Sequence, residues 1–322
     1  IRKIVISTGV VTTLAGSSQG STDATGTSAS FNSPRGITTD GTNLYVADYG
    51  NHRIRKIVIS TGVVTTLAGS SQGSTDATGT SASFNSPRGI TTDGTNLYVA
   101  DYGNHRIRKI VISTGVVTTL AGSSSGSTDA TGTSARFNGP TEMTTDGTNL
   151  YVTDQFNHTI RKIVISTGVV TTLAGSAGSS GSSDGTGTSA RFNQPVGIVT
   201  DGTNLYVGDF NNHKIRKIVI STGVVTTIAG SGSPGSTDGT GTSARFNGPR
   251  GIITDGTNLY VTESNNQMVR KIVISTGVVT TLAGSAGSSG STDGTGTAAR
   301  FNFPWGMTTD GTNLYVADRN NH

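Results

Sequence analysis

The chain has 322 residues, with 23 basic and 19 acidic side chains, a formal net charge of +4 and no cysteine, which excludes disulfides, thiolate metal sites and cysteine nucleophiles. No segment approaches the roughly 18 consecutive apolar residues that a membrane-spanning helix requires. Residue 1 already lies inside a repeat, so we expect neither membrane insertion nor a signal peptide within this sequence.

One repeated unit accounts for the whole chain. The stretch IRKIVISTGVVTTLAG at Ile1 returns in near-identical form at Ile54, Ile107, Ile160, Ile215 and Val269, so the units contain 53, 53, 53, 55, 54 and 54 residues. No linker or change of composition interrupts them, which predicts a single domain over residues 1–322. The first two units are identical at all 53 positions, which indicates recent duplication or engineering.

Each unit contains four segments typical of β-strands, rich in Val, Ile, Thr, Leu and Tyr. In one copy these are residues 36–39, 44–47, 54–60 and 63–68. An Asp-Gly turn separates the first two segments, and Gly62 allows a tight turn between the last two. A long loop rich in Gly, Ser and Thr, such as residues 17–32, then leads to the next unit.

Four antiparallel strands recurring six times predict an all-β fold, a six-bladed β-propeller of four-stranded blades, because no unit can bury both faces of its sheet alone. The chain starts in the third strand of a unit and stops just before another third strand. We therefore expect the strands from Ile1 to Ala15 to complete the blade begun by residues 306–317, which closes the ring and removes a free sheet edge.

The segment PRGITTDGTNLYVADYGNHRIRKI, residues 34–57, resembles the NHL-repeat family of β-propellers, named for an Asn-His-Leu tripeptide. Similar segments recur along the whole chain, although the leucine is replaced by Arg53, Thr159 or Lys214 and one unit has Asn-Gln-Met at residues 266–268. The resemblance implies the fold but not one function, because relatives include protein-binding, RNA-binding and enzymatic propellers.

Enzymes that are similar to the NHL-repeat family carry His or carboxylate metal ligands around the central channel, on or near the innermost strand. Apart from the turn aspartates, the corresponding strands here offer only Glu142. We therefore expect no channel metal and no cofactor. No Ser-His-Asp arrangement or phosphate-binding loop is present either, so the sequence predicts a protein that is not an enzyme.

Several polar residues repeat in every unit or nearly so, which predicts structural roles. One position carries His52, His105, His158, His213 and His322, for which we expect a structural hydrogen-bonding role in each blade. The carboxylate that ends the second strand, Asp48 in one unit, is expected to pair with the repeated arginine of the third strand. The loop carboxylates, such as Asp23, lie in segments only vaguely like a calcium loop, and weak cation binding is the minor alternative for them.

A specific function should reside where the repeats differ from one another. The differences concentrate after the proline that precedes the first strand and in the link between the second and third strands. In an antiparallel blade these two places lie at the same end, so they should converge around one mouth of the channel. The candidate ligand-binding residues there are Arg35, Arg88, Glu142, Phe156, Phe210, Arg250, Phe303, Trp305 and Arg319. Exposed aromatic and arginine side chains are typical of recognition surfaces.

The sequence thus predicts a non-enzymatic recognition or scaffold module that binds a protein or a carbohydrate. One alternative is a structural or adhesive building block of a larger surface protein, with self-association. Another is an RNA-binding propeller whose arginines contact phosphates and whose aromatic rings stack on bases. Neutral sequence drift on a surface without function would explain the same differences between the repeats. The Ser, Thr and Gly loops and the sequon at residues 157–159 favour an extracellular or cell-surface location, with the cytoplasm left open.

Overall fold

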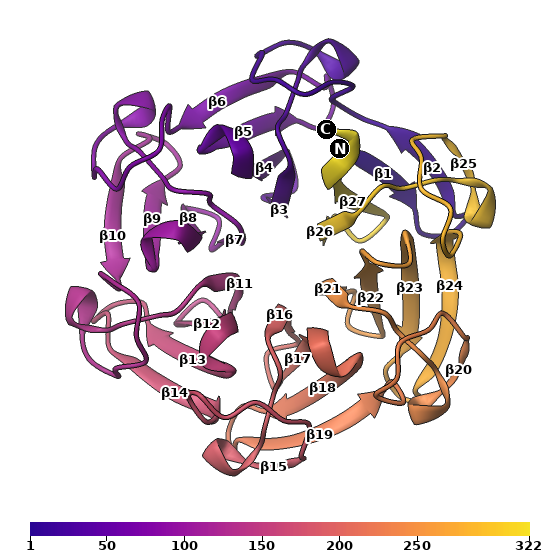
Figure 1. Ribbon diagram of the computed structural model, residues 1–322. Coiled ribbons are helices and arrows are strands. Elements are labelled where there is room, and N and C mark those ends of the chain that lie inside the picture. The colour runs from indigo at the N-terminus through magenta and orange to yellow at the C-terminus, as the bar shows by residue number, and fades with distance from the viewer.

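Six antiparallel sheets surround a central channel in the computed structural model, which describes residues 1–322 (Figure 1). The predicted six-bladed β-propeller is confirmed. The helical segments are all three-residue 3-10 turns. No helix has the length and apolar character needed to span a membrane.

Five blades run from the channel outward in chain order, and the sixth combines C-terminal inner strands with N-terminal outer strands. The innermost strands are β3 (Pro34–Thr39), β7 (Ile90–Thr92), β11 (Pro140–Thr145), β16 (Pro195–Thr200), β21 (Pro249–Thr254) and β26 (Pro304–Thr309). The second strands are β4 (Asn43–Asp48), β8 (Asn96–Asp101), β12 (Asn149–Asp154), β17 (Asn204–Asp209), β22 (Asn258–Glu263) and β27 (Asn313–Asp318). The third strands are β5 (Arg53–Val58), β9 (Arg106–Val111), β13 (Thr159–Val164), β18 (Lys214–Val219), β23 (Met268–Val273) and β1 (Arg2–Val5). The outer strands are β6 (Val64–Ala68), β10 (Val117–Ala121), β14 (Val170–Gly175), β19 (Val224–Ala229), β24 (Val278–Gly284) and β2 (Val10–Thr13).

Two features of the connections were not predicted. In five of the six blades the link between the second and third strands forms a 3-10 turn: η2 (Tyr49–Asn51), η4 (Tyr102–Asn104), η6 (Gln155–Asn157), η8 (Phe210–Asn212) and η11 (Arg319–Asn321). The long loops carry the turns η1 (Gly26–Ser28), η3 (Gly79–Ser81), η5 (Gly132–Ser134), η7 (Gly187–Ser189), η9 (Gly241–Ser243) and η10 (Gly296–Ala298). In three blades the loop also adds a two-residue edge strand, β15 (Gly185–Thr186), β20 (Gly239–Thr240) or β25 (Gly294–Thr295), along the outer strand. These edge strands partly cover the open outer edge of their three sheets.

The two ends of the chain close the ring as expected. Strand β1 pairs antiparallel with β27, with Arg2 opposite Val316 and Ile4 opposite Leu314. The last sheet therefore has the order β25-β2-β1-β27-β26, and the N- and C-termini lie side by side (Figure 1). The main-chain hydrogen bonds of the ring thus continue across the seam.

The apolar core lies between neighbouring blades. One cluster joins Leu44 and Val46 of β4 to Tyr315 and Ala317 of β27, and equivalent clusters of ten or eleven buried residues fill the other interfaces. The second strands are covered on both faces, which explains their continuous apolar sequence. Burial of this apolar surface holds the blades to one another.

A buried arginine links each blade to its long loop. In the first complete blade, Arg55 is fully buried and donates to Asp48 at 2.9 Å and to Asp23 at 2.6 Å. The predicted pairing with the carboxylate of the second strand is confirmed. Asp23 also accepts hydrogen bonds from the backbone N–H and the hydroxyl of Thr66, so both of its oxygens have partners within the protein.

The repeated histidines join neighbouring blades, which confirms their structural role. His52 has a left-handed backbone with φ of 56°, and its Nδ1 accepts a hydrogen bond from the Ser86 N–H at 3.0 Å. In the unit without histidine, Gln267 accepts the equivalent bond from the Phe303 N–H at 2.6 Å. Burial lowers the pKa of His52, which favours the neutral ring that can accept this bond.

Candidate recognition site at the channel mouth

The strand directions bring the variable positions of the repeats to one face. Pro34, at the start of β3, lies opposite Asp48 at the end of β4, and the turn η2 follows directly. The same arrangement recurs in each blade, so the residues after the prolines and the second-to-third links surround one mouth of the channel. The main chain also approaches closely here, because the Gly36 N–H donates to the carbonyl of Arg88 in the next blade at 2.8 Å.

Five side chains from four blades meet at this mouth, and we call them the mouth cluster: Arg35, Arg88, Arg250, Trp305 and Arg319. The guanidinium carbons of Arg250 and Arg35 lie 4.0 and 4.3 Å from the centre of the Trp305 ring. Those of Arg319 and Arg88 lie 5.4 and 5.8 Å from the same centre. A single indole therefore organises four positively charged groups.

A second set of aromatic rings supports the arginines from the links. The Arg88 and Arg35 guanidinium carbons lie 3.3 Å and 3.4 Å above the rings of Tyr102 and Tyr49. The Arg250 guanidinium carbon lies 4.1 Å from the centre of the Phe210 ring. In the last blade the Arg319 guanidinium carbon lies 5.7 Å from the centre of the Phe303 ring.

Arg35 and Arg250 each lie within 4.3 Å of two ring centres, and these contacts restrict the movement of their guanidinium groups and leave the N–H groups as the means of contact.

None of the four arginines forms an ion pair, in contrast to Arg55 and its counterparts. Arg88 donates to the side-chain oxygen of Gln155 at 2.9 Å, whereas Nη1 of Arg35 and Nε1 of Trp305 are buried without a hydrogen-bond partner in the protein. Arg35 and Arg88 are only 4% and 9% exposed. Burial, and then the neighbouring guanidinium groups, lower the pKa of Arg35 and of Arg250. The cluster thus concentrates positive charge, and burial of this charge without a counter-charge lowers the stability of the fold.

Glu142 lies deeper than the mouth cluster. It occupies the innermost-strand position that is glycine in the other five blades and lines a central cavity of about 60 Å³, together with residues of all six innermost strands. Its Oε1 is buried without a hydrogen-bond partner. Burial raises the pKa of Glu142 to about 8, and the charges of Arg88 and Arg35 offset this only in part. Glu142 therefore belongs to the channel wall, and the structure does not place it on the open face.

The expected aromatic surface is buried to a larger extent than the sequence suggested. Trp305 is only 3% exposed, because Arg319 of its own blade and arginines from three other blades cover it. Phe210 and Phe303 are partly buried, whereas Phe156 is 40% exposed and lies 6.3 Å from Tyr102 between ring centres. Phe156 is thus the aromatic ring most available to a ligand. Sequence reasoning did not select the supporting ring of Tyr102, although aromatic residues recur at its repeat position.

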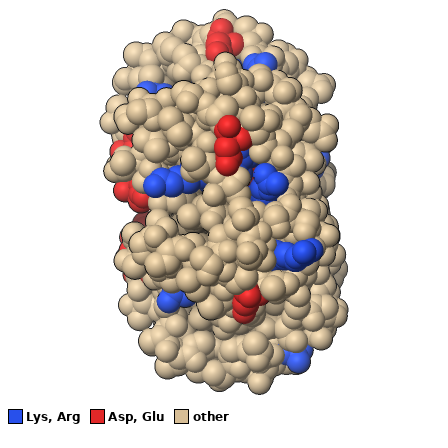
Figure 2. All heavy atoms as spheres, turned by 90° about the vertical axis from the view of Figure 1, so that its left-hand side faces the viewer, with Lys and Arg blue, Asp and Glu red and all other residues tan.

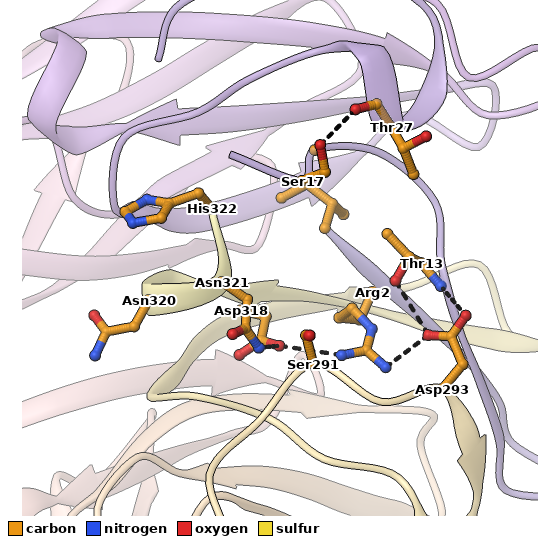
Figure 3. A pocket seen from close by; sticks show the side chains of 12 residues that line it. Arg2, Thr13, Ser17, Thr27, Ser291, Asp293, Asp318, Asn320, Asn321 and His322 are labelled. Atoms are coloured by element: carbon orange, nitrogen blue, oxygen red, sulfur yellow. Dashed lines mark hydrogen bonds and ion pairs between the residues drawn. The ribbon is translucent and has the colours of Figure 1, made fainter. Parts of the chain in front are cut away.

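The larger of the two cavities lies at the seam between the chain ends, and no residue of the mouth cluster lines it (Figure 3). It has a volume of about 470 Å³, and Arg2 lies within it between Asp318 and Asp293, at 3.3 and 2.8 Å. These are the same buried ion pairs that every other blade forms. The charges in the cleft are therefore already paired, and it offers no group that the scaffold does not use.

The side of the outer wall seen in Figure 2 carries both basic and acidic side chains. On the side shown in Figure 2, basic and acidic side chains lie singly among uncharged residues. No group of three or more His, Asp or Glu side chains lies close enough together to hold a metal ion. The concentration of unpaired charge at the mouth thus differs from the wall seen in Figure 2.

Comparison with known proteins agrees with this architecture. The NHL repeat model matches residues 31–57 and 84–110. Protein SUPPRESSOR OF QUENCHING 1 of Arabidopsis thaliana is 31% identical over 282 residues, which cover 80% of this chain and 26% of that protein. NHL repeat-containing protein 2 of Bos taurus is 29% identical over 329 residues, covering 90% of this chain and 45% of that protein. A crystal structure of a Bacteroides thetaiotaomicron protein of unknown function matches with a TM-score of 0.73 and 23% identity, over 99% of this chain and 73% of that one.

Proposed function

The chain belongs to the NHL-repeat β-propellers, and on that premise we propose that it is a non-enzymatic recognition module that binds its ligand at the mouth cluster. It spans less than half the length of the curated relatives described above, so their whole-protein activities do not decide its role. The observation that carries the proposal is the meeting of Arg35, Arg88, Arg250, Arg319 and Trp305, all at positions where the repeats differ.

The composition of this face supports a protein or carbohydrate ligand. Phe156 offers an exposed ring beside Tyr102, and the four guanidinium groups offer N–H donors in fixed planes. Aromatic and arginine side chains at the centre of a face are the residues that most often dominate recognition energetics. RNA binding would use the same arginines and is one outcome of the experiment below.

A screen of glycans, peptides and RNA against the purified chain tests the proposal. Phe156→Ala and Arg319→Gln should weaken capture of the ligand by about tenfold or more, because each removes a contact from the exposed part of the face. Arg245→Gln is the matched control, since Arg245 is an exposed loop arginine outside the mouth cluster. Retention by both mouth variants of the affinity of the unmodified chain would contradict the proposal.

A second candidate function, a structural block that self-associates, is favoured by a different surface. Five of the six blades each expose a valine at one repeat position on their outer side, with 36 to 38% of the residue accessible: Val63, Val116, Val169, Val224 and Val278. Contact between copies at these positions would bury apolar surface that a single copy leaves exposed. Sedimentation velocity across a hundredfold range of concentration tests this role, and a Val169→Lys/Val224→Lys variant should remain monomeric where the unmodified chain associates.

We propose an extracellular or cell-surface location on loop composition alone. The sequon adds no support, because the Asn157 side-chain amide is buried and donates to the Gly126 carbonyl at 2.7 Å and to Asp154 at 2.7 Å. A glycan on that nitrogen would break both bonds. Mass spectrometry of secreted protein should therefore find Asn157 unmodified.

A further inference from the structure

We propose that the mouth cluster binds a compact oxyanion with two or more negative charges, such as a sulfate or phosphate group. This inference rests on the proposed function and adds the chemical class of the ligand. Its first ground is charge. Four guanidinium groups lie within 5.8 Å of one indole centre, and no carboxylate lies within ion-pair distance of any of them.

The second ground is that two of the arginines are more than nine-tenths buried and still have unused donors. Arg35 is 4% exposed, and its Nε and Nη1 have no hydrogen-bond partner in the protein. Arg88 is 9% exposed and uses Nη1 for Gln155. Buried donors of this kind stabilise the fold little by themselves, whereas an anion that accepts from them gains charge-assisted hydrogen bonds in a poorly hydrated setting.

The third ground is preorganisation. The rings of Tyr49, Tyr102, Phe210 and Trp305 hold the guanidinium planes from their faces, at 3.3 to 4.3 Å in the closest contacts. A stacked guanidinium presents its N–H edge and has little side-chain entropy left to lose on binding. Arg250 and Arg319 are partly exposed and can reach an anion arriving from solvent.

The one carboxylate beneath the cluster does not neutralise it. Glu142 lies in the channel wall without an ion pair to Arg35 or Arg88, and five of the six innermost strands carry glycine at its position. A monovalent anion would leave most of the positive charge of the cluster uncompensated. The preference should therefore rise with the charge of the ligand, from chloride and acetate to sulfate and phosphate.

Trp305 provides a direct signal, because it is the only tryptophan of the chain and the four arginines surround it. Titration with sodium sulfate or sodium phosphate at constant ionic strength should change its fluorescence in a saturable manner, with sodium acetate and sodium chloride as controls. A sulfated disaccharide and its unsulfated form then separate a free inorganic anion from the same group on a sugar. Tighter binding of the sulfated sugar than of sulfate identifies the sugar-borne group as the better ligand.

The variants identify the site. Arg250→Gln and Arg319→Gln should each raise the dissociation constant by about tenfold, since each removes one charge-assisted contact. The control Arg245→Gln should leave it unchanged. Sulfate should also raise the melting temperature of the unmodified chain above its value in chloride of equal ionic strength. The Arg250→Gln/Arg319→Gln double variant should not show this rise in melting temperature.

The outcomes separate this inference from the proposed function. A screen ligand that still depends on Phe156 and Arg319, combined with no saturable response to any multivalent anion, would overturn the anion site and leave the recognition face in place. Binding of sulfate that is equal in the Arg250→Gln/Arg319→Gln variant and in the Arg245→Gln control would also overturn it. Loss of both kinds of binding from the unmodified chain would overturn the two proposals together.

Discussion

Replacement of Glu142 by glutamine should stabilise the protein at neutral pH and leave its stability nearly unchanged in acid. The carboxyl is buried in the channel wall, its Oε1 has no hydrogen-bond partner, and burial raises its pKa from an ordinary value of 4.5 to about 8. Between these two values the folded protein keeps the proton while the unfolded chain releases it. The contribution of Glu142 to stability is therefore complete below pH 4.5 and is lost as the pH rises toward 8.

The size of the effect follows from the two pKa values. Proton linkage gives a destabilisation of less than about 1 kcal/mol at pH 5, about 3 kcal/mol at pH 7 and about 4 kcal/mol at pH 8. Glutamine has the same shape and cannot ionise, so Glu142→Gln should be more stable than the unmodified chain by these amounts. Glu142→Gly restores the residue of the other five blades and should show the same pH trend, displaced by about 0.5 to 1 kcal/mol for the added freedom of glycine.

Urea denaturation of the three proteins at pH 5, 7 and 8 measures the effect directly. The difference in free energy of unfolding between Glu142→Gln and the unmodified chain should grow with pH. A constant difference would show that Glu142 does not change protonation on folding. A glutamine variant less stable than the unmodified chain at pH 8 would show that Glu142 is ionised and serves as a counter-charge for Arg35 and Arg88, which refutes the reasoning.

Three further predictions concern the scaffold. His213→Gln should keep the hydrogen bond to the next blade, as Gln267 does in its own blade. Burial lowers the pKa of His213, so the unfolded chain takes up the proton first and the unmodified protein loses stability below about pH 6.5; the glutamine variant should lose less. An unchanged pH profile of stability in urea denaturation would contradict this. Gly197→Ala should lower the free energy of unfolding by about 1 to 3 kcal/mol or more, because the added Cβ would overlap the Arg250 carbonyl. The control Gly208→Ala should lower it by less than about 1 kcal/mol, since other blades carry alanine at that position. Equal urea midpoints of the two variants would contradict this. Deletion of residues 1–16 removes β1 and β2, so a single sharp thermal transition in the shortened chain would argue against closure by the termini.

The architecture was predictable because its causes are local and repeated. Segments such as LYVAD and IRKIV have high β-propensity, and the glycines and Asp-Gly pairs between them favour tight turns. Six copies of such a unit bury their sheets against one another when they stack in a ring. The Arg55 to Asp48 pairing was predictable from the same register. The edge strands β15, β20 and β25 were missed because their Gly-Thr sequence has no strand preference, and only the neighbouring outer strand gives them partners.

The site was predictable in its position and not in its depth. Antiparallel connection alone places Arg35 and Arg319 at the same mouth. The burial of Trp305 depends on arginines that come from blades up to 270 residues away in sequence, such as Arg35, and no local pattern carries that information. The expectation of an exposed tryptophan was therefore wrong, and Phe156 takes its place as the exposed ring.

Comparison of the six repeats also distinguishes residues that the fold requires from residues that it does not require. The position after the proline holds arginine in three blades and Thr141, Val196 or Trp305 in the others, and the blade forms in each case. Arginine is thus not required there for the fold. The scaffold arginines are each paired with two carboxylates. The arginines of the mouth cluster have no ion pair, and the burial of Arg35 and Arg88 without one lowers stability. A costly arrangement that the blade does not need is best explained by what it contacts outside the chain, and this is why the mouth cluster, and not the larger cleft at the seam, is the place to look for a ligand.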